Sequence, residues 1–233
     1  MALAHTPDSL RIGADRELQQ ALRACWQRDE SCSHTPDQWL AEQFSSLIPH
    51  LIQDQRFQPD WERLLKDAHD AEAQGHKPSV IGPLTYLWFA QAEQGLDKLD
   101  LLERLLPAYG EIFGRLAARG VEWVQIDEPI LTLDLPLEWR NAFERAYHIL
   151  QYSPLKKLVA TYRGDLKDNL GVAALLPVTG LHIDSVSVPE QLGPVFDRLP
   201  TYKVLSLGSA SDQVELVQEA RARFGDNLLL ACA

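Results

Sequence analysis

The sequence predicts a parallel α/β fold, and three observations support this prediction. Short apolar runs alternate with longer segments in which apolar residues recur every three or four positions. The runs contain four to six mostly apolar residues, which is typical of strands buried on both faces. A hydrophobic content of 45% is enough for a sizeable core. A doubly wound sheet and a closed (β/α)8 barrel both satisfy this pattern.

Three helices are expected in the first third of the chain. Apolar residues lie at helical spacing over 14–26. A Thr-Pro-Asp sequence at 35–37 is a typical helix start, and the apolar positions of this second helix continue to Leu51. The third helix is expected over 59–75, where Gly75 ends it.

Seven apolar runs are predicted strands, one fewer than a closed barrel needs. They are Ser9–Gly13, Ser79–Pro83, Trp123–Asp127, Leu158–Tyr162, Leu181–Asp184, Val204–Leu207 and Asn227–Cys232. No G-x-G-x-x-G or G-x4-G-K-[ST] loop follows any of them, which removes the commonest nucleotide-binding form of the doubly wound alternative. Because no linker or low-complexity tract is present, residues 1–233 are expected to form one domain.

The charge balance and the cysteine content exclude several classes of function. With 22 Lys and Arg against 33 Asp and Glu, the net charge of −11 argues against nucleic acid and anionic membranes as partners. No run approaches the roughly 20 apolar residues of a membrane span. The N-terminal segment lacks a basic start followed by an apolar core, so a cytoplasmic location is expected. Three cysteines are typical of a reducing compartment, and Cys25, Cys32 and His34 match no metal-ligand spacing.

Polar residues that end the apolar runs are the candidates for a binding site, because ligands of parallel α/β folds bind at the carboxyl ends of strands. These residues are expected to surround one mouth of the fold. They are Arg11, Asp127, Glu128, Tyr162, Arg163, Asp184, Ser185, Ser206, Ser209 and Cys232.

The Asp127-Glu128-Pro129 sequence is the most informative of these. Neighbouring strand residues point to opposite sides, so only one of the two carboxylates is expected to face the mouth. Two carboxylates in different environments can divide acid and base roles or bind a cationic group. The alternative is structural, with one carboxylate capping a turn and the other pairing with Arg163 or Arg11.

Two further positions leave alternatives open. His182 lies two residues before Asp184 on the same strand face, so it is either a ligand-binding residue or a core imidazole. Arg16 and Glu17 open the first predicted helix and form either a solvated helix end or an anion-recognition site.

Several segments, in this order and spacing, resemble the N-terminal domain of cobalamin-independent methionine synthase. They are Arg11–Gly13, Arg16–Leu18, Phe57, Trp61, Gly82–Trp88, Val121–Pro129, Gly180–Asp184, Leu199–Pro200 and Leu205–Ser206.

The resemblance implies a (β/α)8 barrel, one of two that face each other in an enzyme of methionine biosynthesis. That methyltransferase passes a methyl group from polyglutamylated methyltetrahydrofolate to homocysteine. Zinc belongs to the C-terminal barrel, so no cofactor is expected in this chain. The folate's glutamate tail would meet the segment Arg16-Glu17-Leu18-Gln19 and a family lysine whose position falls at Gln38.

The sequence departs from the family at the tail-binding positions and in one segment. Gln19 and Gln38 are neutral where relatives have cations, so folate binding should be weakened. Between Gln27 and Pro36 the chain lacks a segment that carries another strand in relatives. A reduced barrel is therefore expected, either without its second strand or with the gap closed by another element.

Three functions remain open. The chain is a reduced relative of the synthase barrel that does not catalyse alone, or an accessory subunit that docks on a separately encoded catalytic barrel. The third possibility is an independent small-molecule enzyme with Asp127 or Glu128 as its base and Asp184 and Arg163 as orienting groups. The ligand would be a folate or another small molecule.

Overall fold

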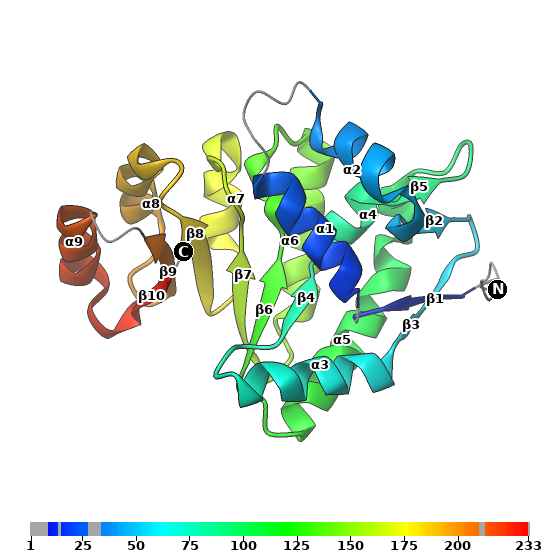
Figure 1. Ribbon diagram of the computed structural model, residues 1–233, viewed down its shortest axis with the longest axis horizontal. Helices are drawn as coiled ribbons and strands as arrows, with labels where there is room; N and C mark the ends of the chain where they lie inside the picture. Colours follow the sequence, from blue (N-terminus) through cyan, green and yellow to red (C-terminus); the bar gives the residue numbers. More distant parts are fainter. Residues whose placement is uncertain (1–8, 14, 28–33, 210–212, 233) are drawn as a thin grey trace.

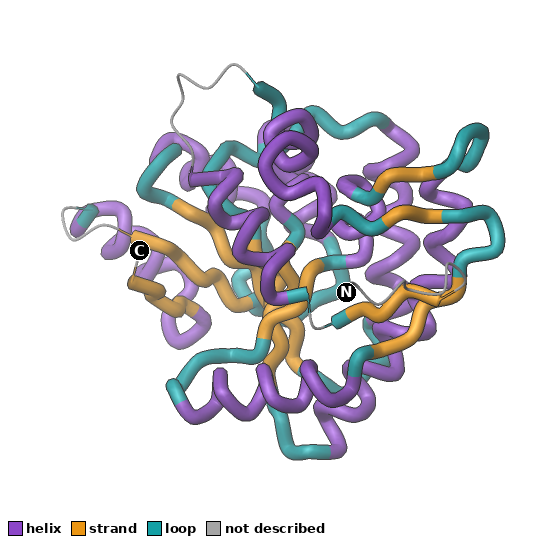
Figure 2. Tube along the Cα trace, turned by 45° about the vertical axis from the view of Figure 1, so that its right-hand side comes forward, coloured by secondary structure: helices purple, strands orange, loops and turns teal. Residues whose placement is uncertain are grey.

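The computed structural model describes residues 9–13, 15–27, 34–209 and 213–232. Its centre is a parallel six-stranded sheet with the order β10-β9-β8-β7-β6-β4, and two parallel two-stranded sheets, β1-β3 and β2-β5, complete the strands of the described residues (Figure 1). Helices alternate with the strands along the chain, as Figure 2 shows. The predicted parallel α/β fold is confirmed.

The element bounds are as follows. The strands are β1 (Ser9–Ile12), β2 (His50–Leu51), β3 (Arg56–Pro59), β4 (Ser79–Ile81), β5 (Gln91–Ala92), β6 (Trp123–Asp127), β7 (Lys156–Ala160), β8 (Gly180–Asp184), β9 (Val204–Ser209) and β10 (Leu228–Cys232). The α-helices are α1 (Arg16–Gln27), α2 (Pro36–Phe44), α3 (Trp61–Ala73), α4 (Pro83–Phe89), α5 (Leu102–Ala118), α6 (Leu137–Leu150), α7 (Leu170–Leu175), α8 (Leu192–Arg198) and α9 (Val214–Phe224). Short 3-10 helices cover Ser45–Leu47, Lys98–Leu101, Pro129–Thr132, Lys167–Asn169, Pro189–Gln191 and Gly225–Asn227.

Each predicted strand forms, and the structure adds β3, which the sequence did not suggest. β3 pairs in parallel with β1 from Ser9 opposite Arg56 to Ile12 opposite Pro59. Of the two expected arrangements, the structure agrees with the second, because another element, β3, lies beside β1. In the described residues no ladder joins this pair to the six-stranded sheet, so the hydrogen-bonded strands do not close into a ring.

The second predicted helix is shorter than expected. Thr35 caps α2 by accepting a hydrogen bond from the Gln38 backbone, and the Gln38 side chain accepts one from the Thr35 backbone in return. The helix ends at Phe44, and His50–Leu51 instead form β2 beside β5. The apolar positions that predicted a longer helix belong partly to this short sheet.

The two faces of the six-stranded sheet differ in chemistry. On one face, the strands present apolar side chains that are buried, among them Val124, Ile126, Val159, Ile183 and Leu207. The alternate positions face α1 and, apart from apolar residues such as Leu158, are polar or small: Ser79, Gln125, Asp127, Ala160, His182, Asp184, Ser206 and Gly208. No helix of the described residues is long and apolar enough to cross a membrane.

Candidate functional site

A cavity of about 930 Å³ lies between α1 and the polar face of the six-stranded sheet. Residues from α1, from the end of α3 and from β4, β6, β7, β8 and β9 line it. The lining includes Arg16, Gln19, Gln20, Arg23, Gln27, Asp67, His76, Lys77, Ser79, Gln125, Ala160, Tyr162, Arg163, His182, Asp184, Ser206 and Gly208. The predicted gathering of polar strand ends is thus found for Tyr162, Arg163, Asp184 and Ser206.

Helix α1 forms one wall of the cavity because its polar residues recur at helical spacing. Arg16, Gln19, Gln20, Arg23 and Gln27 all line the cavity, and none of them is acidic. The opposite face of the helix, including Leu18, Ala21 and Leu22, is buried in the core. Amide and guanidinium groups supply many N–H donors, so this wall suits a ligand rich in acceptors.

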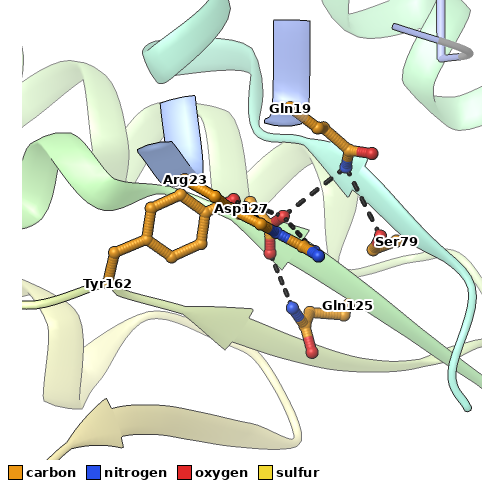
Figure 3. Close-up of polar contacts among 6 residues, drawn as sticks. All are labelled: Gln19, Arg23, Ser79, Gln125, Asp127 and Tyr162. Atoms are coloured by element: carbon orange, nitrogen blue, oxygen red, sulfur yellow. Dashed lines mark hydrogen bonds and ion pairs between the residues drawn. The ribbon is translucent and has the colours of Figure 1, made fainter. Parts of the chain in front are cut away.

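Asp127 lies behind this wall, fully buried, and accepts hydrogen bonds from four side chains. Figure 3 shows them converging on the carboxylate. The Tyr162 hydroxyl donates to Oδ2 at 2.7 Å and Gln125 Nε2 donates to Oδ1 at 2.7 Å. Arg23 Nη2 and Gln19 Nε2 lie 3.3 Å and 3.5 Å from Oδ2. The carboxylate therefore fixes four groups that themselves line the cavity.

Glu128, the next residue, points to the other side of the strand and is also fully buried. Its carboxylate accepts from the backbone N–H groups of Leu84 and Thr85 at the start of α4, and from the hydroxyls of Thr85 and Tyr147. Burial raises the pKa of Glu128 to about 7, although the hydrogen bonds from Thr85, Tyr147 and Leu84 oppose the rise. Glu128 thus anchors a helix.

The two carboxylates divide as the alternation along a strand predicts, with one toward the mouth and one away from it. The structural alternative named Arg163 or Arg11 as the ionic partner, whereas the structure pairs Asp127 with Arg23. Glu128 caps α4, which precedes β6 in the chain, and does not cap the turn that follows β6.

His182 and Asp184 lie on the same face of β8 and both line the cavity. His182 Nδ1 lies 2.9 Å from Ser206 Oγ, on the neighbouring strand. Asp184 accepts from the Val186 backbone and the Ser187 hydroxyl, which fixes the turn after β8. Ser185 points away and binds the Gly208 carbonyl.

Other predicted site residues lie outside the cavity. Arg11 is exposed and pairs with Asp60, while Glu17 is exposed and pairs with Arg63. Leu18 belongs to the core, and Gln38 completes the capping box of α2. Cys32 lies outside the described residues, as do the side chains of Ser209 and Cys232.

The cavity has the opposite charge from the chain as a whole. Four cationic side chains line it, Arg16, Arg23, Lys77 and Arg163, against the two acidic side chains of Asp67 and Asp184. The net charge of the chain is −11. A local excess of cations in an acidic protein concentrates anions at this site.

The family profile of the cobalamin-independent synthase N-terminal domain matches residues 33–211. The chain belongs to this family. A B12-independent methionine synthase from Shewanella sp. W3-18-1, solved in complex with selenomethionine, has a similar fold with a TM-score of 0.51. The identity is 13%, over 88% of this chain and 60% of that one. A methyltransferase from Methanosarcina mazei gives a TM-score of 0.46 at 11% identity, over 84% of this chain and 57% of that one.

This synthase-family domain thus spans about 60% of the length of the Shewanella enzyme. The described residues contain no group of three or more His, Cys, Asp or Glu side chains placed to hold a metal ion.

Sequence reasoning missed the cavity wall of the synthase-family domain. Arg23, Gln20 and Gln27 on α1 and Lys77 before β4 were not predicted as site residues. The spacing of the polar residues on α1 was the available signal. A polar helical stripe usually faces solvent, so the spacing alone did not indicate a binding wall.

Proposed function

We propose that this chain is a non-catalytic ligand-binding domain of methionine-synthase type. It holds methyltetrahydrofolate with its glutamate tail in the cavity, and it takes part in methyl transfer to homocysteine together with a zinc-bearing catalytic barrel. The observation that carries the proposal is the wall of α1, whose five polar residues are all N–H donors and which faces an open cavity.

The positions of the arginines suit a ligand with separated carboxylates. Arg16 and Arg23 are seven residues apart on α1, so they lie about 10 Å apart along the helix axis. Both are about half exposed, and each already pairs with a carboxylate, Asp67 at 3.6 Å and Asp127 at 3.3 Å. These partners hold the guanidinium groups at the cavity while leaving N–H groups for a ligand.

Gln19 and Gln38, the neutral residues at the family's tail-binding positions, differ in their effect on the charge of the cavity. Gln38 lies outside the cavity in the capping box of α2, so its lack of charge does not alter the wall. Gln19 lines the cavity and donates toward Ser79 and Asp127, so one cation is replaced there by an amide donor. Arg16, Arg23, Lys77 and Arg163 remain to bind anionic groups.

The geometry does not favour an independent enzyme that uses Asp127 or Glu128 as a base. Both carboxylates have no exposed surface and accept hydrogen bonds from several donors. A general base must reach the proton that it removes, directly or through one water. Asp127 therefore serves as a positioning residue in this proposal.

Calorimetric titration with methyltetrahydrofolate bearing one and three glutamates tests the proposal. We expect the triglutamate to bind more tightly, and Arg23→Ala to weaken its binding about tenfold, since a charge-assisted hydrogen bond contributes about 1.5–3 kcal/mol. Arg11→Ala, at an exposed arginine outside the cavity, is the matched control and should bind as the unmodified chain does. Equal losses in the two variants, or no binding at all, would contradict the proposal.

The accessory role is tested separately. Gel filtration of an equimolar mixture with a zinc-bearing catalytic barrel at micromolar concentration should give co-elution. Methionine formation from methyltetrahydrofolate triglutamate and homocysteine should require both chains. Methionine formed at enzymatic rates by this chain alone would show that the domain is catalytic.

A further inference from the structure

The floor of the cavity contains a pair of polar residues that the proposed function does not use. His182 on β8 and Ser206 on β9 are direct neighbours in the sheet register, and His182 Nδ1 lies 2.9 Å from Ser206 Oγ. Both line the cavity, opposite the wall formed by α1. The pair is therefore placed to contact whatever occupies the cavity.

The second ring nitrogen of His182 is open to a ligand. Nε2 has no hydrogen-bond partner within the part of the chain that the structure describes. Gly208, two residues beyond Ser206 on the same face, leaves space beside the ring: a Cβ there would lie 3.7 Å from Nε2. Ala160, the neighbour of His182 on β7, is also small. His182 is only partly buried, and Nε2 is not among the fully buried side-chain atoms that lack a partner, so this nitrogen is accessible from the cavity.

The charges around His182 are of both signs, within a cavity that has an excess of cations. Asp127 on β6, Asp184 on β8 and Lys77 before β4 act on the imidazole. Arg16, Arg23 and Arg163 add positive charge to the cavity, and Asp67 adds negative charge at the α3 side. Burial lowers the pKa of His182 below its ordinary value of 6.5, which Asp127 and Asp184 partly offset. The empty cavity therefore favours the neutral ring, and an added anion would favour the charged one.

We propose that His182 is a proton-linked binding residue for a small organic polycarboxylate. When a carboxylate of the ligand enters the cavity, Nε2 takes up a proton from solvent and donates a hydrogen bond to that carboxylate. Nδ1–H then donates to Ser206 Oγ, which holds the ring in position. The inference rests on the proposed function only in placing the ligand in this cavity.

The affinity for the ligand and the pKa of His182 are thermodynamically linked. If the ligand binds the protonated form more tightly, it raises the pKa of His182, and by reciprocity its affinity rises as the pH falls. A rise of one unit corresponds to about a tenfold gain in affinity once the ring is fully protonated. The affinity at pH 6 should therefore be measurably higher than at pH 8.

The test uses N-acetylaspartylglutamate, a tricarboxylate whose carboxyl groups stay ionised across this pH range. Its affinity is measured by calorimetry at both pH values, and the ring signals of His182 are followed by NMR. We expect tighter binding at the lower pH and a rise in the pKa of His182 on saturation. His182→Gln, which keeps polarity without a titrating ring, should bind weakly and with no pH dependence.

His148→Gln is the matched control, since His148 is exposed on α6 outside the cavity and is also lost as a titrating group. It should keep the pH dependence, while Ser206→Ala should reduce it. The proposal is overturned if His182→Gln keeps the pH dependence or if the ligand leaves the His182 signals unmoved. The folate proposal can fail on its own. If methyltetrahydrofolate does not bind but the tricarboxylate still binds with proton uptake, only the folate proposal is contradicted. Folate binding with an unchanged pH profile in His182→Gln contradicts the His182 proposal alone.

Discussion

Asp127 and Glu128 are adjacent, equally buried and chemically almost identical, yet they belong to different parts of the molecule. Asp127 faces α1 and gathers Gln19, Arg23 and Tyr162 at the cavity. Glu128 faces the opposite layer and holds the start of α4. The face of the strand, and not the residue type, therefore decides whether a buried carboxylate organises a ligand site or the start of a helix.

The largest effect is expected from crowding the Glu128 side. Gly82 has no side chain, and a Cβ at this position would overlap the Glu128 carboxyl group. Gly82→Ala should therefore lower the free energy of unfolding by about 3 kcal/mol or more, as expected when a buried, hydrogen-bonded group is displaced. Urea denaturation measures this. Gly114→Ala in α5, where no atom lies within 4 Å of the added Cβ, should be neutral or slightly stabilising.

The second-largest effect is expected in the pH dependence of stability, to which Glu128 contributes. Burial raises the pKa of Glu128 from 4.5 to about 7, so the folded chain holds this proton more tightly than the unfolded chain. The stabilisation is complete below pH 4.5 and is lost as the pH rises to about 7, on the order of 3 kcal/mol in all. Burial also raises the pKa of Asp15 to about 6, which contributes with the same sign.

Glu128→Gln should flatten this part of the curve, measured by urea denaturation at several pH values. Glu144→Gln, at an exposed position on α6, controls for the loss of one carboxylate. A Glu128→Gln curve that falls as steeply as that of the unmodified chain would contradict the assignment.

Changing Asp127 should lower ligand affinity and should destabilise the fold less than Gly82→Ala does. In Asp127→Asn the amide oxygen can still accept from Gln125, while the amide nitrogen faces the donors of Tyr162 and Arg23. We expect a loss of about 1–2 kcal/mol in unfolding free energy and about tenfold in affinity for the folate triglutamate. Asp134→Asn, at a largely exposed carboxylate paired with Lys167, should change neither quantity. A larger loss of stability than in Gly82→Ala would invert the comparison.

The smallest effect is expected from Tyr162→Phe. It removes one hydrogen bond to Asp127 and leaves the other three donors and the ring in place. Unfolding free energy should fall by about 1 kcal/mol and affinity by a few-fold. Tyr202→Phe, at a highly exposed tyrosine, should leave denaturation and titration curves unchanged.

The strands of the central sheet could be predicted because they are buried and therefore apolar. β6, β8 and β9 appear in the sequence as short, mostly apolar runs, and their predicted positions agree within two residues. β3 could not be predicted in the same way, since it alternates exposed and half-buried residues and ends in Pro59. Its formation depends on pairing with β1, which lies 47 residues earlier in the register.

The site could be predicted only where strand ends determine it. Asp127, Arg163, Asp184 and Ser206 follow from the rule that ligands bind at the carboxyl ends of parallel strands. Arg23 did not, because its position in the site depends on how α1 packs across the sheet. That packing is a tertiary contact between residues 104 positions apart, which local patterns do not encode.

The order of the strands also sets how the chain can assemble during synthesis. In the six-stranded sheet, β6 pairs with β4, and each strand from β7 to β10 pairs with the strand immediately before it in the chain. From β6 onward the sheet can therefore grow one strand at a time, because each new strand pairs with a strand that has already been made. β1 must wait until β3 has been made, and Arg23 of α1 reaches Asp127 only after β6 has joined the sheet. The cavity is thus completed late, after the helix that forms its wall has long been available.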